Sequence, residues 1–124
     1  MQLTTQVVED VGTVQVRGEV DRFVAPRLER VMQRMLRDGI SQLVIDCHGI
    51  EFIDSAGLGA ILQAYIRAKA QGATVTLHRP DASICRLLQV TGLDGVVSVS
   101  EPIAEPHEGV AGQGQRQVEG ADEA

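Results

Sequence analysis

The sequence predicts a single small α/β domain in which a mixed, mostly parallel sheet is backed by helices. Strand-like and helix-like segments follow one another in the order β-β-α-β-α-β-α-β. Such alternation in the second half of the chain implies right-handed crossovers between parallel strands. The composition agrees, because 44% hydrophobic and 23% charged residues are ordinary values for a globular protein. A length of 124 residues is enough for one domain with its own core.

The first two strands are expected to form a hairpin that leads into a helix. Residues 2–9 and 13–17 alternate between apolar and polar side chains, and a turn is predicted at residues 10–12. The segment Gly-Glu-Val-Asp at 18–21 is predicted to leave the second strand. The helix begins at Ala25-Pro26, because proline is tolerated in a first turn, and ends at Gly39. Its apolar stripe consists of Leu28, Val31, Met32, Met35 and Leu36.

The middle of the chain holds a third strand and a second helix. The apolar run at residues 43–47 predicts a central strand buried on both faces, and residues 48–54 are expected to form a loop. Asp54 or Ser55 can serve as the N-cap of the helix, which ends near Gly72. The apolar positions on one face of this helix are Leu58, Ile61, Leu62, Tyr65 and Ile66.

Two glycines in the first turns of the second helix need an explanation. Gly57 and Gly59 each cost roughly 1 kcal/mol relative to alanine in a helix interior. One explanation is that they let the start of the helix press against its own sheet. The other is that they leave a bare surface for the backbone of a partner. The sequence leaves both explanations open.

The last part of the chain completes the domain and adds a tail. A strand is predicted at residues 73–78, and a helix that carries Ile84, Leu87 and Leu88 starts at Pro80-Asp81 and ends at Gly92. A final strand is predicted at residues 96–99. Residues 1–100 therefore form the domain. Residues 101–124 hold six acidic residues and one arginine, few large aliphatic residues and many glycines, so they are predicted to be a disordered acidic tail.

Composition argues against several classes of partner. A net charge of −6 and an aromatic content of 2% without tryptophan disfavour binding to a phosphate backbone or stacking on bases. The sequence shows no signal peptide and no apolar run of about 18 residues. We therefore expect a cytoplasmic protein with reduced thiols that binds neither nucleic acid nor membrane.

No pattern of residues predicts catalysis, a metal or a cofactor. Cys47 and His48 are adjacent, so in a strand their side chains point to opposite faces. Ser55 lacks the glycine two residues earlier that a nucleophile elbow requires. The sequence Gly57-Leu58-Gly59 matches neither a dinucleotide fingerprint nor a phosphate loop. We expect a protein that is not an enzyme.

Ser55 is better interpreted as the acceptor of a modification. A serine at a helix N-terminus lies at the surface, where the helix dipole favours an anion. A phosphate would add a charge of about −1.5 to −2 there without unfolding the domain. It would change the charge and the shape of a nearly neutral surface beside Asp54. This is the physical basis of a docking switch.

Three stretches in the same order resemble STAS domains, and specifically bacterial anti-sigma factor antagonists. The first is Gly-Glu-Val-Asp at 18–21 with the helix after it, and the second is Phe-Ile-Asp-Ser-Ala-Gly-Leu-Gly at 52–59. The third is Arg-Leu-Leu-Gln-Val-Thr-Gly-Leu at 86–93. The resemblance covers residues 3–100 and omits the tail.

The resemblance implies a non-catalytic protein that works by partner switching. In that family the unphosphorylated antagonist binds an anti-sigma factor that is also a serine kinase, which frees a sigma factor. The kinase then phosphorylates the serine after the aspartate, and a serine phosphatase restores binding. Carried over by position, the acceptor is Ser55, and Ala56 stands where many relatives have a second hydroxyl. The expected partner-binding residues are Asp21, Asp54, Ser55, Gly57, Leu58 and Gly59.

A second function is compatible with the same resemblance. STAS domains also occur in transporters and in accessory subunits of lipid-transport systems, where no such kinase acts. The alternative is therefore a non-switching accessory subunit of a transport system. The intact Asp54-Ser55 pair and the lack of a membrane segment favour the antagonist.

Overall fold

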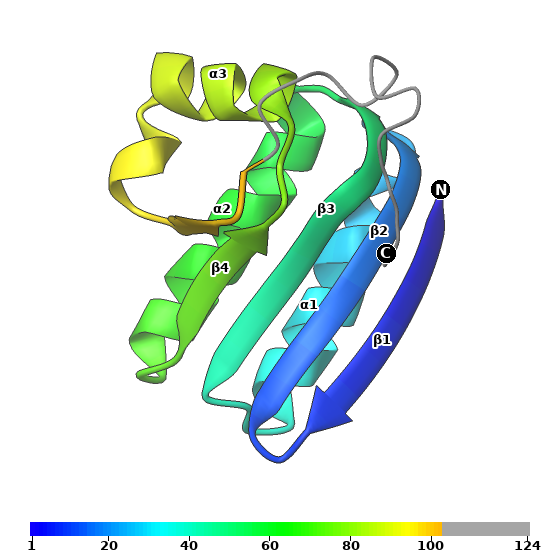
Figure 1. Cartoon of the computed structure of the whole chain (residues 1–124). Coiled ribbons are helices and arrows are strands. Elements are labelled where there is room, and N and C mark those ends of the chain that lie inside the picture. Colours follow the sequence, from blue (N-terminus) through cyan, green and yellow to red (C-terminus); the bar gives the residue numbers. More distant parts are fainter. Residues whose placement is uncertain (103–124) are drawn as a thin grey trace.

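The computed structural model describes residues 1–102 and contains a five-stranded sheet with the strand order β1-β2-β3-β4-β5 (Figure 1). Apart from Glu101 and Pro102, the predicted acidic tail lies outside the described residues. The predicted order of elements is confirmed, with one short 3-10 helix added before the last strand. The elements are β1 (Gln2–Val8), β2 (Val11–Val20), α1 (Ala25–Arg37), β3 (Gln42–Ile53), α2 (Ser55–Ala70), β4 (Thr74–His78), α3 (Ala82–Thr91), the 3-10 helix η1 (Leu93–Gly95) and β5 (Ser98–Ser100).

The sheet is mixed and mostly parallel, as predicted. Strand β1 pairs antiparallel with β2, whereas β2, β3, β4 and β5 run parallel to one another. Helices α1 and α2 lie side by side behind the sheet, and α3 lies near the ends of β3 and β4 (Figure 1). Because the strands that precede α1 and α2 run parallel, their carboxyl ends meet at one edge of the sheet.

The turn of the hairpin differs from the prediction at residues 10–12. Val8 pairs with Val11, so the turn consists of Glu9 and Asp10, and Glu9 adopts a left-handed φ of 58°. Gly12 belongs to β2, where an added Cβ would lie 2.7 Å from Met35 Cε. Gly12 is therefore a strand residue that packs against Met35 of α1 and is not part of the turn.

Strands β2 and β3 are longer than predicted. The segment at 18–21 was expected to leave the strand, but β2 continues to Val20, and the loop expected at 48–54 is mostly strand as far as Ile53. The two strands pair along this extension, with register shifts beside Arg17 and Gly18. These irregularities interrupt the alternation of apolar and polar residues, which is why the pattern did not reveal the extension.

The core lies between the sheet and the helices, and no helix of residues 1–102 covers the opposite face of the sheet (Figure 1). In β3, Leu43, Ile45 and Cys47 are buried, whereas Val44 and Asp46 on the opposite face are only half-buried. The prediction that this strand is buried on both faces is therefore wrong. Among the described residues, the apolar run packs against helices on one side of the sheet alone.

Helix α2 buries a face that overlaps only in part with the predicted one. Leu58 and Ile61 are buried as expected, but Leu62 and Tyr65 are only half-buried and Ile66 is 49% exposed. The remainder of the buried face consists of small residues, which allow close approach to the sheet and to α1; they are Gly57, Ala60, Ala64 and Ala68.

Helix α3 begins and ends as the sequence predicted. The Oδ1 atom of Asp81 accepts a hydrogen bond of 3.0 Å from the amide of Ile84, which identifies Asp81 as the N-cap. Gly92 ends the helix with a left-handed φ of 82°. The final strand is later than predicted, because η1 intervenes and β5 covers residues 98–100.

Candidate functional site

The two loops that follow β2 and β3 form one corner of the molecule. Val20 and Ile53, the last residues of these strands, are register partners, and the amide of Asp54 donates a 3.3 Å hydrogen bond to the carbonyl of Val20. Asp21 directly follows Val20 and Asp54 directly follows Ile53. The parallel pairing therefore brings the Gly-Glu-Val-Asp and Asp-Ser motifs to the same edge of the sheet.

Asp54 is the N-cap of α2, which decides between the two predicted alternatives. Its backbone is extended, and its Oδ1 accepts hydrogen bonds of 2.9 Å from the amide of Ala56 and 3.1 Å from the amide of Gly57. Its carbonyl accepts a hydrogen bond of 3.0 Å from the amide of Leu58. Three amides of the first turn are thus already satisfied by one residue.

Ser55 is the first residue of α2 and is exposed. Within residues 1–102 its hydroxyl has no hydrogen-bond partner, since the cap is provided by its neighbour Asp54. The side chain is therefore free to react without loss of a contact that holds the helix. This separation of roles, with Asp54 structural and Ser55 accessible, is what an acceptor at a helix start requires.

We expect Asp54→Ala to lower the free energy of unfolding by about 0.5–2 kcal/mol, because the amides of Ala56 and Gly57 lose their acceptor. Asp54→Asn is the matched control, since asparagine is an equally good N-cap residue. Urea unfolding of the three proteins measures the difference. Equal stability of Asp54→Ala and wild type would show that the cap contributes nothing.

Asp21 fixes the loop between β2 and α1. Its Oδ1 accepts hydrogen bonds of 3.0 Å from the amide of Phe23 and 3.2 Å from the amide of Val24. Its carbonyl accepts a further hydrogen bond of 2.8 Å from the amide of Ala25. Val24 occupies the N-cap position of α1 but provides no side-chain cap. The half-buried carboxylate of Asp21 therefore orders the loop from within.

The two glycines at the start of α2 have different environments. Gly57 is buried, and a Cβ on it would lie 2.5 Å from Ile53 Cγ1 and 2.9 Å from the carbonyl oxygen of Val20. A Cβ on Gly59 would meet no atom of residues 1–102 within 4 Å beyond its chain neighbours and the backbone of its own helix. The first of the two predicted explanations therefore holds for Gly57, which lets the helix press against its sheet. Gly59 is half-exposed and open.

The six predicted partner-binding residues accordingly fall into two groups. Gly57 is buried and Leu58 is only 5% exposed, so neither lies on the surface that was expected for them. Both were predicted from their place in the motif, which does not distinguish the inner from the outer face of a helix turn. The other four, Asp21, Asp54, Ser55 and Gly59, are half-exposed or exposed at the corner.

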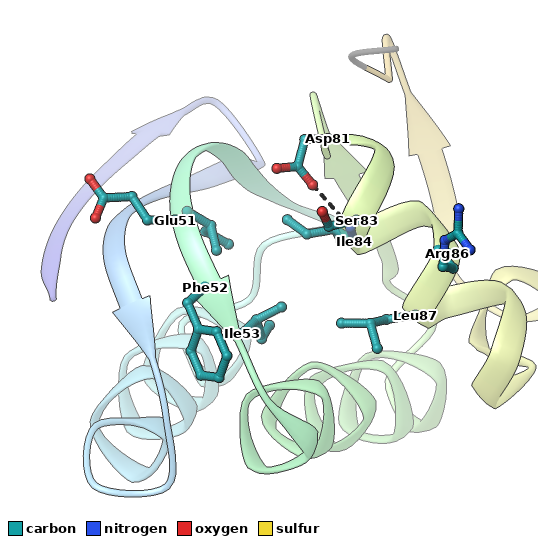
Figure 2. Close-up of a pocket in the computed structure, with 9 residues that line it drawn as sticks. Glu51, Phe52, Ile53, Asp81, Ser83, Ile84, Arg86 and Leu87 are labelled. Atoms are coloured by element: carbon teal, nitrogen blue, oxygen red, sulfur yellow. Dashed lines mark hydrogen bonds between the residues drawn. The ribbon is translucent and has the colours of Figure 1, made fainter. Parts of the chain in front are cut away.

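Two exposed phenylalanines near this corner were missed in the sequence. Phe23 is 77% exposed and Phe52 is 53% exposed, and the chain has no other phenylalanine. Phe52 also lines a cavity of about 440 Å³ between the end of β3 and helix α3 (Figure 2). The signal was present, since each phenylalanine lies two residues from Asp21 or Asp54.

The described part of the chain provides no candidate metal or thiol chemistry. Residues 1–102 contain no group of three or more His, Cys, Asp or Glu side chains that could hold a metal ion. Burial raises the pKa of the Cys47 thiol far above its usual range, so the thiol remains protonated at neutral pH. Cys47 and Cys85 are free cysteines. Within the same residues, no helix combines the length and apolar character needed to cross a membrane.

These features define a class of small α/β domain in which an aspartate caps a helix and presents the following serine at the end of parallel strands. The chain belongs to the STAS domain family, whose model matches residues 2–107. The family predicted from three motifs is thereby confirmed.

Two anti-sigma factor antagonists are similar to this chain in sequence, and one of them is a solved structure with a similar fold. The anti-sigma-B factor antagonist of Staphylococcus aureus is 28% identical over 88 residues, which cover 71% of this chain and 82% of the relative. An anti-sigma factor antagonist from Mycobacterium paratuberculosis superposes with a TM-score of 0.72 at 26% identity, covering 80% of this chain and 84% of that chain.

More distant structures show the same fold. The anti-sigma factor antagonist SpoIIAA in its unphosphorylated form has a TM-score of 0.68 at 15% identity and covers 88% of this chain and 94% of its own. SpoIIAA of Bacillus has also been solved in the phosphorylated form. A sulfate transporter family protein from Wolinella succinogenes has a TM-score of 0.67 at 18% identity, covering 79% of this chain and 82% of that chain.

Proposed function

We propose that this protein is an anti-sigma factor antagonist that is switched off by phosphorylation of Ser55. In the unphosphorylated state it binds an anti-sigma factor, which is also a serine kinase, and so releases a sigma factor. The kinase transfers the γ-phosphoryl group of ATP to the Ser55 hydroxyl oxygen, and a serine phosphatase removes it by hydrolysis. The protein itself catalyses no step. The observation that carries the proposal is the exposed Ser55 hydroxyl beside the capping carboxylate of Asp54.

The geometry of the cap gives a physical reason for the switch. A phosphate on Ser55 would be tolerated by the helix dipole, but the amides of Ala56 and Gly57 are already bonded to Asp54. The phosphate would therefore lie beside the Asp54 carboxylate without taking these amides as donors. Its charge of about −1.5 to −2 adds to that of Asp54 and makes this corner strongly negative. A partner that fits the neutral serine closely would be repelled by this change.

The four accessible residues of the motif support a docking role. Asp21 orders the neighbouring loop, Asp54 holds the helix start, and Gly59 leaves open space on the outer side of α2. We propose that these residues surround Ser55 in the contact with the kinase. The names of the relatives from Staphylococcus aureus and Mycobacterium paratuberculosis agree with an anti-sigma factor as the partner.

The test is phosphorylation of wild type and Ser55→Ala by the anti-sigma kinases of the source organism, followed by intact-mass measurement. We expect wild type to gain the mass of one phosphate and Ser55→Ala to gain none. Because Asp54 provides the cap, Ser55→Ala should remain folded and should still bind the kinase. Stoichiometric phosphorylation of Ser55→Ala would place the acceptor elsewhere and refute the proposal.

The alternative function is a non-switching accessory subunit of a transport system. It is favoured by one observation, the shared fold of the sulfate transporter family protein from Wolinella succinogenes. The same experiment separates the two functions. An accessory subunit should acquire no phosphate, and substitution of Ser55 should leave its binding to the transporter unchanged.

A further inference from the structure

The two phenylalanines of this chain are exposed. No aromatic side chain is buried in the core of residues 1–102. Phe23 is 77% exposed and Phe52 is 53% exposed. A single exposed apolar residue needs no explanation, but two large aromatic rings at one corner of a small protein do. Aromatic residues are enriched at the centres of protein interfaces, where they contribute much of the binding energy.

Both phenylalanines lie near the end of β3, which directly precedes the Asp54-Ser55 pair. Phe52 precedes Ser55 by three residues, which places their Cα atoms within about 10 Å of each other. Phe23 follows Val20 by three residues, and Val20 pairs with Ile53 at the end of the sheet. Neighbouring strands are about 4.8 Å apart, so Phe23 lies within about 15 Å of Ile53. Phe23 therefore lies in the loop after β2 and Phe52 near the end of β3, at the corner that carries Ser55.

The loop that carries Phe23 is ordered before any partner binds. The amide of Phe23 donates a hydrogen bond of 3.0 Å to Asp21 Oδ1, which fixes the backbone at this position. The guanidinium carbon of Arg22 lies 5.0 Å from the centre of the Phe23 ring. This distance allows a cation–π contact that restrains the ring while it remains exposed. A side chain that is held in place loses less conformational entropy on binding.

Phe52 extends the apolar surface into a cavity. The cavity of about 440 Å³ is lined by residues 50–53 of β3 and by α3, with Ile53 and Leu87 pointing toward each other across it (Figure 2). Its lining also includes Arg86 and the N-cap Asp81 of α3. Phe52 thus connects the corner around Ser55 with an apolar depression on the side of α3.

We infer that Phe23 and Phe52 are the anchors through which the anti-sigma kinase holds this protein while its nucleotide faces Ser55. This inference rests on the proposed function. A kinase must bring the γ-phosphate of ATP to hydrogen-bonding distance of the Ser55 hydroxyl, so its surface must cover the corner. A standard interface buries about 800 Å² on each partner. A circular patch of that area has a radius of about 16 Å, so a patch centred on Ile53, two residues before Ser55, reaches the Cα atoms of both phenylalanines.

The test is isothermal titration of the kinases of the source organism, each loaded with Mg²⁺ and ADP, with wild type, Phe23→Ala and Phe52→Ala. We expect each substitution to weaken binding at least tenfold, as loss of an aromatic anchor does. Ile66→Ala is the matched control, since Ile66 is 49% exposed on α2, and it should bind within twofold of wild type. The melting temperatures check folding, and Phe23→Ala should keep that of wild type because its ring is largely solvated.

Each outcome decides a different point. If wild type binds a kinase but Phe23→Ala and Phe52→Ala bind as tightly as Ile66→Ala, the inference is wrong and the proposed function stands. If wild type binds none of the kinases, the proposed function fails and the inference fails with it. Sedimentation of wild type alone tests a second copy as the occupant. If wild type is a dimer and Phe23→Ala is a monomer, the partner of these two rings is a second copy of this chain and not the kinase.

Discussion

Gly57→Ala is expected to lower the free energy of unfolding by about 2–3 kcal/mol, at the upper end of the usual cost of overpacking. The new Cβ would lie 2.5 Å from Ile53 Cγ1 and 2.9 Å from the carbonyl oxygen of Val20. The Ile53 side chain can shift, but the Val20 carbonyl cannot move freely, because it accepts the amide of Asp54. The start of α2 must therefore move away from the sheet. Urea unfolding measures the loss.

Gly59→Ala, two residues further along the same helix, is the matched control for this substitution. Its Cβ would clash with no other part of the described chain, so the gain in helix propensity of about 1 kcal/mol should appear as added stability. Comparison of the two variants separates the effect of side-chain packing on stability from that of helix propensity, since both changes add the same methyl group to the first turns of α2. A stable Gly57→Ala protein would show that the helix does not need close contact with β2.

Ser55→Glu is expected to weaken binding to the anti-sigma kinase by about a hundredfold, which corresponds to roughly 3 kcal/mol. An acid at the first position of a helix is favoured by the dipole, so the domain should remain folded. The new carboxylate nevertheless lies beside that of Asp54. The partner would therefore meet two negative charges at a site where wild type presents one carboxylate and a neutral hydroxyl. Phosphate should weaken binding further, because it carries nearly two charges instead of one. Isothermal titration measures the affinities.

Ser55→Gln separates charge from size in this prediction. Glutamine has nearly the same shape as glutamate without the charge, so it should retain most of the affinity if repulsion drives the switch. Equal losses for Ser55→Gln and Ser55→Glu would show that bulk at Ser55 ends the interaction. Full affinity for Ser55→Glu, together with loss of binding on phosphorylation, would show that a second charge or the phosphate geometry is required.

The local signals in the sequence were sufficient to predict the order of elements and the family. Caps and stops depend on a few adjacent residues, so Asp81 and Gly92 marked the ends of α3 correctly. The same is true of the Asp54-Ser55 pair, although the sequence alone left open which of the two caps α2. The motif identified Ser55 as the candidate acceptor because a helix N-terminus is a local property of the chain.

The tertiary structure decided which of these residues are buried and how far the strands extend. Gly57 and Gly59 are equivalent in sequence, but only Gly57 faces the carbonyl of Val20. This contact arises because β2 and β3 continue in parallel to Val20 and Ile53, through register shifts that obscure the alternating pattern. The same pairing brings Phe23 and Phe52 to one corner. Contacts between segments some 30 residues apart depend on strand register, and periodicity along a single segment contains no information about it.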